Sequence, residues 1–170
     1  MAGLNRGEWS EFLAILDLLE NPQFKVVDSN LKTIDTTTFC LKNIILHTNS
    51  NLFKIVRSTN TVEVFKNDVL KYTISIQEIT KNKQVLFTEI KENQSKSGSF
   101  SIPEIVPFIQ KLNENNIIKS CSQSKSDVDT YIFDSRVNKI KNIKYSIKSQ
   151  LGSPATIFKC KSANKYIVSC

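Results

Sequence analysis

Apolar and polar residues alternate most clearly in residues 126–153, near the end of the chain. A first apolar run, residues 128–133, begins directly after Asp127, and residues 143–147 form a second run in which apolar and polar side chains alternate. The polar residues 138–142 separate the two runs. Two β-rich runs joined by a polar connection predict an antiparallel hairpin.

The two ends of this predicted hairpin carry side chains with a shared chemical use. In an antiparallel pair the start of one strand lies beside the end of the other, so Asp127 and Lys148 are predicted to be neighbours at the open end. Ser146 lies two residues before Lys148 and therefore on the same face of the strand. A carboxylate can bind a divalent cation, and a lysine can polarise a water molecule or stabilise a pentacovalent phosphate. The competing interpretation is an ordinary strand-edge acid and an ordinary surface lysine.

Helical periodicity marks the N-terminal segment. Asn5 and Glu8 have the three-residue spacing of a capping box. Large apolar residues then recur at three- and four-residue intervals as far as Asn21 and Pro22. The pattern predicts an amphipathic helix whose first turns carry Glu8 and Glu11. Taken alone, these acids are interpreted as solvated charges that suit the positive end of the helix dipole.

The rest of the chain predicts short strands, further helices and polar connections. Residues 39–47 are apolar without a regular period, so no element is assigned to them. Ser101 is predicted to cap a helix whose first turn contains Pro103. The other predicted elements are short strands within 24–38, a hairpin of 52–56 with 61–65, a strand at 70–76, a helix at 78–91, a loop at 93–101, strands at 117–122 and 166–168, and a helix at 153–162.

Composition indicates one globular domain with a basic surplus. The chain has 170 residues, of which 40% are hydrophobic and 23% charged, and its net charge is +7. That charge suits a partner that carries phosphates, although a lysine-rich proteome gives the same surplus without one. Four widely spaced cysteines and a single histidine, His47, argue against a zinc site and for reduced thiols. No apolar run reaches the roughly 20 residues of a membrane span and no secretory signal is visible, so a cytoplasmic location is expected.

Three stretches of the chain resemble one known family. They are NRGEWSE at residues 5–11, SGSFSIPEI at 97–105 and YSIKSQLGSPATIF at 145–158, and they resemble HpaII-type restriction endonucleases. The stretches occur in the expected order and span nearly the whole chain. Asp127, the predicted hairpin and Lys148 also resemble the PD-(D/E)XK nuclease signature. Ser146 departs from that signature, because it stands where the second acid is usual.

This resemblance implies a fold and a division of the chain. The implied fold is α+β (mixed α/β), with a central mixed sheet flanked by helices and a restriction-endonuclease-like core. The chain is expected to form a single nuclease-like domain, residues 1–170, in which residues 24–120 are a β-rich insertion between the first helix and the catalytic hairpin. Members of the family continue well beyond the last strand predicted here. We therefore expect a fragment, a split chain or a truncated relative, whose recognition elements lie elsewhere.

The resemblance also implies a function and a metal site. The implied function is that of a type II restriction endonuclease, which hydrolyses DNA phosphodiester bonds with Mg²⁺ at a CCGG-type site. Asp127 and Glu8 are the expected metal ligands, because many nucleases of this fold place an acid from the first helix beside the metal. Asp129 lies on the same side of the strand as Asp127, so Asp129 and Glu11 stay open as alternative ligands.

The other expected site residues share the strand that ends the hairpin. Lys148 would stabilise developing charge on the phosphate, and Gln150 would supply an amide oxygen. Ser146 is included in the site, although a hydroxyl is a poor ligand for Mg²⁺. The expected partners are double-stranded DNA and either a second copy of the chain or a missing C-terminal segment, with no membrane. The alternative function is a non-catalytic basic module that binds nucleic acid or a protein.

Overall fold

The computed structural model of the chain describes residues 3–27, 30, 32–47, 51–93, 98–114, 128–147 and 166–167. The helices within these ranges are α1 (Arg6–Glu20), α2 (Ile76–Glu92), α3 (Val106–Asn113) and a short 3-10 helix, η1 (Pro103–Ile105). The strands are β1 (Leu4–Asn5), β2 (Gln23–Val27), β3 (Thr33–His47), β4 (Leu52–Arg57), β5 (Thr61–Lys66), β6 (Val69–Ser75), β7 (Ser99–Phe100), β8 (Val128–Asp134), β9 (Lys139–Ile147) and β10 (Tyr166–Ile167).

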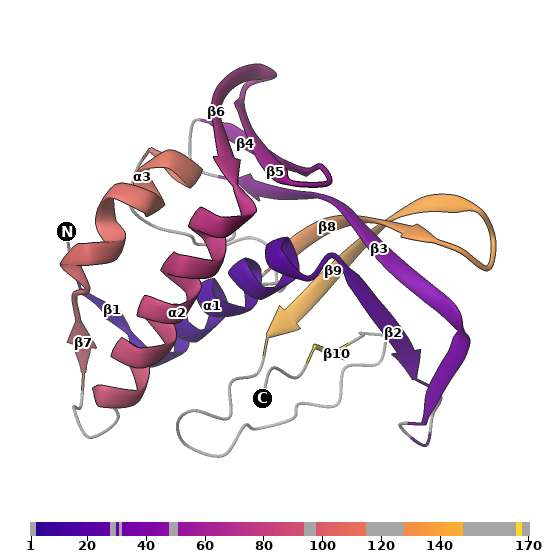
Figure 1. The fold of residues 1–170 in the computed structure, drawn as a ribbon, viewed down its shortest axis with the longest axis horizontal. Helices are drawn as coiled ribbons and strands as arrows, with labels where there is room; N and C mark the ends of the chain where they lie inside the picture. Colours follow the sequence, from indigo (N-terminus) through magenta and orange to yellow (C-terminus); the bar gives the residue numbers. More distant parts are fainter. Residues whose placement is uncertain are drawn as a thin grey trace.

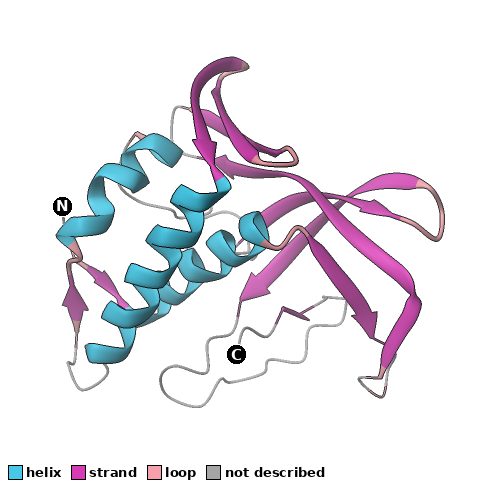
Figure 2. Ribbon diagram, viewed as in Figure 1, coloured by secondary structure: helices cyan, strands magenta, loops and turns pink. Residues whose placement is uncertain are grey.

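Most of the strands form one mixed β-sheet (Figure 1). The strand order is β10-β9-β8-β3-β4-β5-β6, and β2 also pairs with β3. Strands β9 and β10 are parallel, and the other described pairs in this sheet are antiparallel. Figure 2 shows the α-helices gathered on one side of the molecule, while the long strands extend away from them. This arrangement confirms the predicted α+β class with a central mixed sheet flanked by helices.

The helical layer is held to the rest of the protein by apolar burial. Helix α1 buries Trp9, Phe12 and Leu16 on one face, at the spacing that the sequence predicted. Helix α2 packs beside α1 and buries Ile79 and Leu86. The indole Nε1 of Trp9 donates a hydrogen bond to the carbonyl oxygen of Phe100, 3.1 Å away, so α1 is tied to β7 as well. None of the helices in the described part of the chain is long and apolar enough to cross a bilayer.

Strand β3 lies at the centre of the sheet and contains a β-bulge. Phe39 and Leu41 are buried before the bulge, and Ile44 and Leu46 are buried after it. The register with β8 shifts between Leu41 and Asn43, which leaves Lys42 as the extra residue. The bulge changes which alternate residues face the core. Residues 39–47 therefore lack the regular two-residue period from which a strand is predicted.

Most of the predicted elements are confirmed. Helix α1 ends where Asn21 follows it, and β4 and β5 form the predicted hairpin. Strand β6, helix α2 and the last strand, β10, also lie where the sequence predicted them, within a few residues. The predicted strand at 117–122 and the predicted helix at 153–162 lie outside the described residues. Strands β3 to β6 join the same sheet as β8, and the division that makes residues 24–120 an insertion stays a prediction.

Two details of the prediction were wrong. Ser101 does not cap the helix that follows it, because the N-cap of η1 is Ile102, which makes no capping side-chain hydrogen bond. The polar residues 138–142 are not a loop. The turn takes residues 135–138, and β9 begins at Lys139, because Asn138 adopts a left-handed backbone (φ 50°) that closes the turn early.

A buried carboxylate organises this turn between β8 and β9. Asp134 is buried, and its carboxylate accepts hydrogen bonds from the Arg136 backbone N–H (3.1 Å), from Arg136 Nε (3.0 Å) and Nη2 (2.9 Å), and from Lys141 Nζ (2.8 Å). The side-chain hydrogen bonds from Arg136 and then from Lys141 hold the pKa of Asp134 well below its usual range. The Arg136 guanidinium also lies over the ring of Phe39, at 5.2 Å from its centroid.

Truncation of the central strand is expected to be costly. Ile44 is fully buried, so Ile44→Ala should lower the free energy of unfolding by about 2 to 5 kcal/mol, through lost burial and the cavity left behind. Leu70→Ala on the exposed surface of β6 is the control, and it should change stability by less than about 0.5 kcal/mol. Urea denaturation of the two variants measures both effects. Equal losses would contradict the central position of β3.

The Asp134 cluster should make stability depend on pH. The folded-state pKa of Asp134 lies below its unfolded value, which is about 4. The cluster therefore stabilises the fold fully above that unfolded value, and the contribution is lost as the pH falls through the folded pKa. Asp134→Asn should lower the melting temperature at neutral pH, and the difference from wild type should shrink towards about pH 2 to 3. The exposed turn variant Asp68→Asn is the control, and a pH-independent gap for Asp134→Asn would refute this assignment.

Candidate active site at the open end of the β8–β9 hairpin

The predicted hairpin is confirmed as strands β8 and β9. Their antiparallel register runs from Asp134 opposite Lys139 at the turn to Val128 opposite Tyr145 at the open end. Asp127 directly precedes β8 and Lys148 directly follows β9, so both flank the same end of the hairpin in sequence. Asp127, Lys148 and Gln150 lie outside the described residues. The placement of their side chains stays a prediction.

Of the site residues predicted on the second strand of the hairpin and directly after it, only Ser146 has a described backbone. It lies in β9, opposite Tyr166 of β10 in a parallel pairing. Strand β9 is therefore an interior strand at this end, with β8 on one side and β10 on the other.

Asp129 and Lys144 show which side chains share a face near the open end. The two residues are directly opposite each other, and Asp129 Oδ2 lies 3.8 Å from Lys144 Nζ. The Asp129 side chain is 17% exposed, whereas that of Lys144 is 58% exposed. The neighbouring residues Val128 and Thr130 are buried on the opposite face, towards the core. Asp129 thus has a cation beside it already, and its role as the alternative metal ligand stays a prediction.

Glu8 has a structural role at the start of α1. Its backbone N–H donates to Asn5 Oδ1, and its Oε2 accepts from the backbone N–H of Asn5, both at 2.9 Å. This reciprocal pair is the capping box that the sequence predicted. In Figure 1 this end of α1 lies beside β1 and β7. The convergence of Glu8 with Asp127 and Lys148 stays a prediction, as does the alternative role of Glu11.

The amino-acid sequence matches the HpaII restriction endonuclease family over residues 5–168. The chain belongs to this family. The match begins at the capping residue Asn5 and includes the whole β8–β9 hairpin with both of its flanking residues.

One curated relative of this HpaII-family chain is the type II restriction enzyme HpaII of Haemophilus parainfluenzae. The two are 34% identical over 172 residues, which is 95% of this chain and 45% of the relative. The chain therefore spans less than half the length of that relative. No solved structure matches it.

The described residues of this HpaII-family protein do not form a metal centre by themselves. Among them, no group of three or more His, Cys, Asp or Glu side chains is arranged to hold a metal ion. Of the two expected metal ligands, Glu8 is a described residue and Asp127 is not. Two carboxylates nevertheless fit a hard divalent cation, because Mg²⁺ prefers oxygen ligands.

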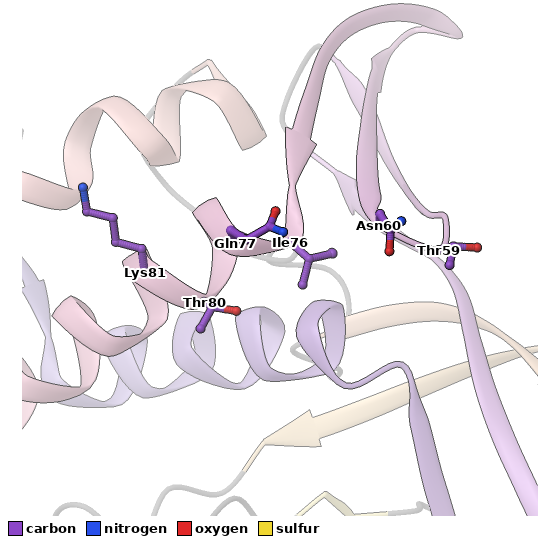
Figure 3. Close-up of a pocket in the computed structure, with 6 residues that line it drawn as sticks. All are labelled: Thr59, Asn60, Ile76, Gln77, Thr80 and Lys81. Carbon is purple, nitrogen blue, oxygen red and sulfur yellow. The ribbon is translucent and has the colours of Figure 1, made fainter.

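A separate hollow of about 420 Å³ lies between the β4–β5 turn and the first turns of α2 (Figure 3). Its lining residues are Thr59, Asn60, Ile76, Gln77, Thr80 and Lys81. None of them is a predicted site residue and none is an acid. Figure 3 shows the Lys81 amine pointing away from the other labelled side chains. The hollow thus lacks the carboxylates that hydrolysis with a divalent cation requires.

The two roles considered for Glu8 can be separated by a pair of variants. Asn5→Ala removes the cap but keeps the carboxylate, and should cost about 0.5 to 2 kcal/mol of stability. Glu8→Gln keeps an N3 side chain that can serve the capping box, so stability should change little. If Glu8 is also a metal ligand, Glu8→Gln should lose Mg²⁺ affinity, whereas Asn5→Ala should retain it. Thermal melts and calorimetric Mg²⁺ titrations measure the two effects, and unchanged Mg²⁺ affinity in Glu8→Gln would leave Glu8 as a cap alone.

Proposed function

We propose that this chain acts as the catalytic part of a type II restriction endonuclease, which hydrolyses DNA phosphodiester bonds with Mg²⁺ at a CCGG-type site. The observation that carries the proposal is the family match, which spans an antiparallel β8–β9 hairpin whose open end is flanked by Asp127 and Lys148. A protein that acts on cellular DNA would work in the cytoplasm of a bacterial cell. The CCGG-type target is taken from the family resemblance.

The proposed metal ligands are Asp127 and Glu8. Their carboxylate oxygens match the preference of Mg²⁺ for hard ligands. A divalent cation bound there supplies a Lewis acid for the phosphate and lowers the pKa of a bound water. Asp127 would hold its carboxylate directly before β8, and Glu8 would contribute a carboxylate oxygen from the first turn of α1.

Lys148 is the proposed charge-stabilising residue. Side chains two residues apart on a strand point to the same side, so Ser146 and Lys148 are expected to share the face of Lys144. Asp127 is expected on the face of Asp129 for the same reason. Because Asp129 and Lys144 are directly opposite, these expectations place Asp127, Ser146 and Lys148 together on one face. Lys148 would then orient the scissile phosphate and stabilise the charge that builds up on it.

Ser146 would bind the phosphate or an ordered water, since a hydroxyl is too weak a donor to replace a carboxylate on Mg²⁺. Gln150 would add an amide oxygen or N–H further along the same face. The absence of an acid at position 146 makes the contribution of Glu8 necessary for a ligand set of two carboxylates.

The distribution of charge supports DNA as the partner. Helices α1, α2 and α3 carry five cationic and seven acidic residues. Strands β2 to β6, β8 and β9 carry nine cationic and four acidic residues. Among the helices and strands counted, the positive surplus therefore lies in the sheet and not in the helical layer. A polyanion attracted to the surplus would approach the strands.

Two DNA strands require two cleavage events. A second copy of the chain, or a partner segment from outside these residues, would supply the second site. The alternative function is a non-catalytic basic module, which the same sheet charge and the missing acid at Ser146 favour. Such a module would bind duplex DNA and leave it intact with every divalent cation.

Plasmid cleavage tests the proposal. The chain should convert supercoiled plasmid to nicked or linear DNA when Mg²⁺ or Mn²⁺ is present. Lys148→Ala and Asp127→Asn should each lower the rate by roughly 100-fold or more, which is typical of the loss of one charge-stabilising group. Lys71→Ala and Asp68→Asn are the matched controls, since both residues are exposed on the β5–β6 hairpin, and they should retain the rate.

Circular dichroism must show that the Lys148 and Asp127 variants are folded. Cleavage that persists in both folded variants would refute the proposed site. Binding of the plasmid without cleavage by any divalent cation would establish the non-catalytic alternative.

A further inference from the structure

The turn end of the β8–β9 hairpin carries a cationic cluster that the proposed cleavage chemistry does not use. Arg136 and Lys141 both bind the carboxylate of Asp134, and the exposed Lys139 lies directly opposite Asp134 in the register. Two cations thus bind one buried anion, and a third lies opposite it in the register. The depressed pKa of Asp134 keeps that anion charged at physiological pH, so the cluster keeps a net positive charge of about two.

The described hydrogen bonds make this cluster a fixed feature of the fold. Thr38 N–H donates to Ser135 Oγ at 3.2 Å, and Ser135 N–H donates to the Thr38 carbonyl at 3.4 Å, which ties the turn to β3. Val137 N–H closes the turn onto the Asp134 carbonyl at 3.4 Å. The guanidinium of Arg136 also lies over the ring of Phe39, so this side chain is already ordered. Binding a ligand would therefore cost it little further conformational entropy.

The cationic side chains are nevertheless open to a partner. The side chains of Arg136 and Lys141 are each 44% exposed. Asp134 receives two of the five N–H groups of the guanidinium, so the outer edge of Arg136 can donate to another oxygen.

The cluster and the proposed active site lie at opposite ends of one rigid hairpin. Six residue steps separate Val128 from Asp134 along β8, which is about 20 Å at the usual rise of a strand. Asp134 lies on the strand face of Val128 and Thr130, opposite to the face of Asp129 and Lys144, so the cluster is separate from the proposed active site. In Figure 1 the turn projects on the side of the molecule away from α2 and α3, where no helix of the described chain covers it.

We propose that Arg136, Lys139 and Lys141, at the turn end of the hairpin around Asp134, form a preorganised site for the phosphates of duplex DNA, apart from the bond that is cleaved. This inference rests on the proposed function and extends it to a second contact. The contact is made to the backbone, so it fixes the position of the duplex and carries no sequence preference.

A salt titration of DNA affinity tests the proposal without cleavage. The 170-residue chain binds a long duplex in Ca²⁺, and the slope of log K against log salt reports the number of phosphates contacted. Lys139→Ala should lower that slope by about one, equally for a CCGG duplex and a scrambled duplex. Lys71→Ala removes an exposed lysine from the opposite edge of the sheet, and should leave the slope unchanged.

A second variant tests the geometry of the cluster. Arg136→Lys keeps the charge but loses the planar fork that binds Asp134 through two N–H groups. It should weaken DNA binding severalfold. A series of shortened duplexes locates the contact. Wild type should lose affinity once the duplex is too short to reach the cluster, whereas Lys139→Ala should lose much less.

The outcomes separate this inference from the proposed function. If wild type binds and cleaves DNA but Lys139→Ala has the slope and length dependence of Lys71→Ala, the phosphate site is refuted and the proposed function stands. If wild type binds neither duplex at low salt, both are refuted. A marked preference of the wild-type cluster for single-stranded RNA, lost in Lys139→Ala, would overturn the assignment of duplex DNA as its partner.

Discussion

The pairing of β3 with β8 is the contact on which the rest of the structure depends. It joins residues 39–45 to residues 129–134, and thereby connects the β2–β6 part of the sheet to the C-terminal hairpin. The cost of closing so long a loop is offset by apolar burial, since Ile44 and Ile132 are both fully buried in the shared core. The β8–β9 hairpin alone would be marginally stable in water. The hairpin is supported because β3 pairs with β8 along most of its length.

The elements that the sequence predicted are those whose signals are local. The capping box of Asn5 and Glu8 and the β8–β9 hairpin follow from residues close in the chain. The sequence did not predict strand β3. The bulge at Lys42 moves the buried positions from one set of alternate residues to the other, and this shift becomes visible only in the pairing with β8. Sequence also identified Asp127 and Lys148 as flanking one end of a hairpin. It missed the Asp134 cluster, although an aspartate two residues before an arginine in a turn is a local signal for it.

We propose that the two ends of the β8–β9 hairpin have different roles, one in catalysis and the other in binding DNA phosphates. The open end is the proposed place for chemistry, which needs an acid and a lysine held by interior strands. At the turn end, Arg136 and Lys141 bind a buried carboxylate, and this arrangement is suited to hold a backbone phosphate.

Paramagnetic broadening by Mn²⁺ tests the central claim most directly, because it locates the metal without relying on cleavage. In ¹⁵N-labelled protein, Mn²⁺ bound at Asp127 should broaden the amide signals of Val128 and Ile147 first, and those of Asp134 and Lys139 last, since they lie about 20 Å away. Asp127→Asn should abolish the effect while the remaining spectrum is preserved. Broadening that is uniform over the protein, or that persists unchanged in Asp127→Asn, would contradict an active site at the open end of the hairpin.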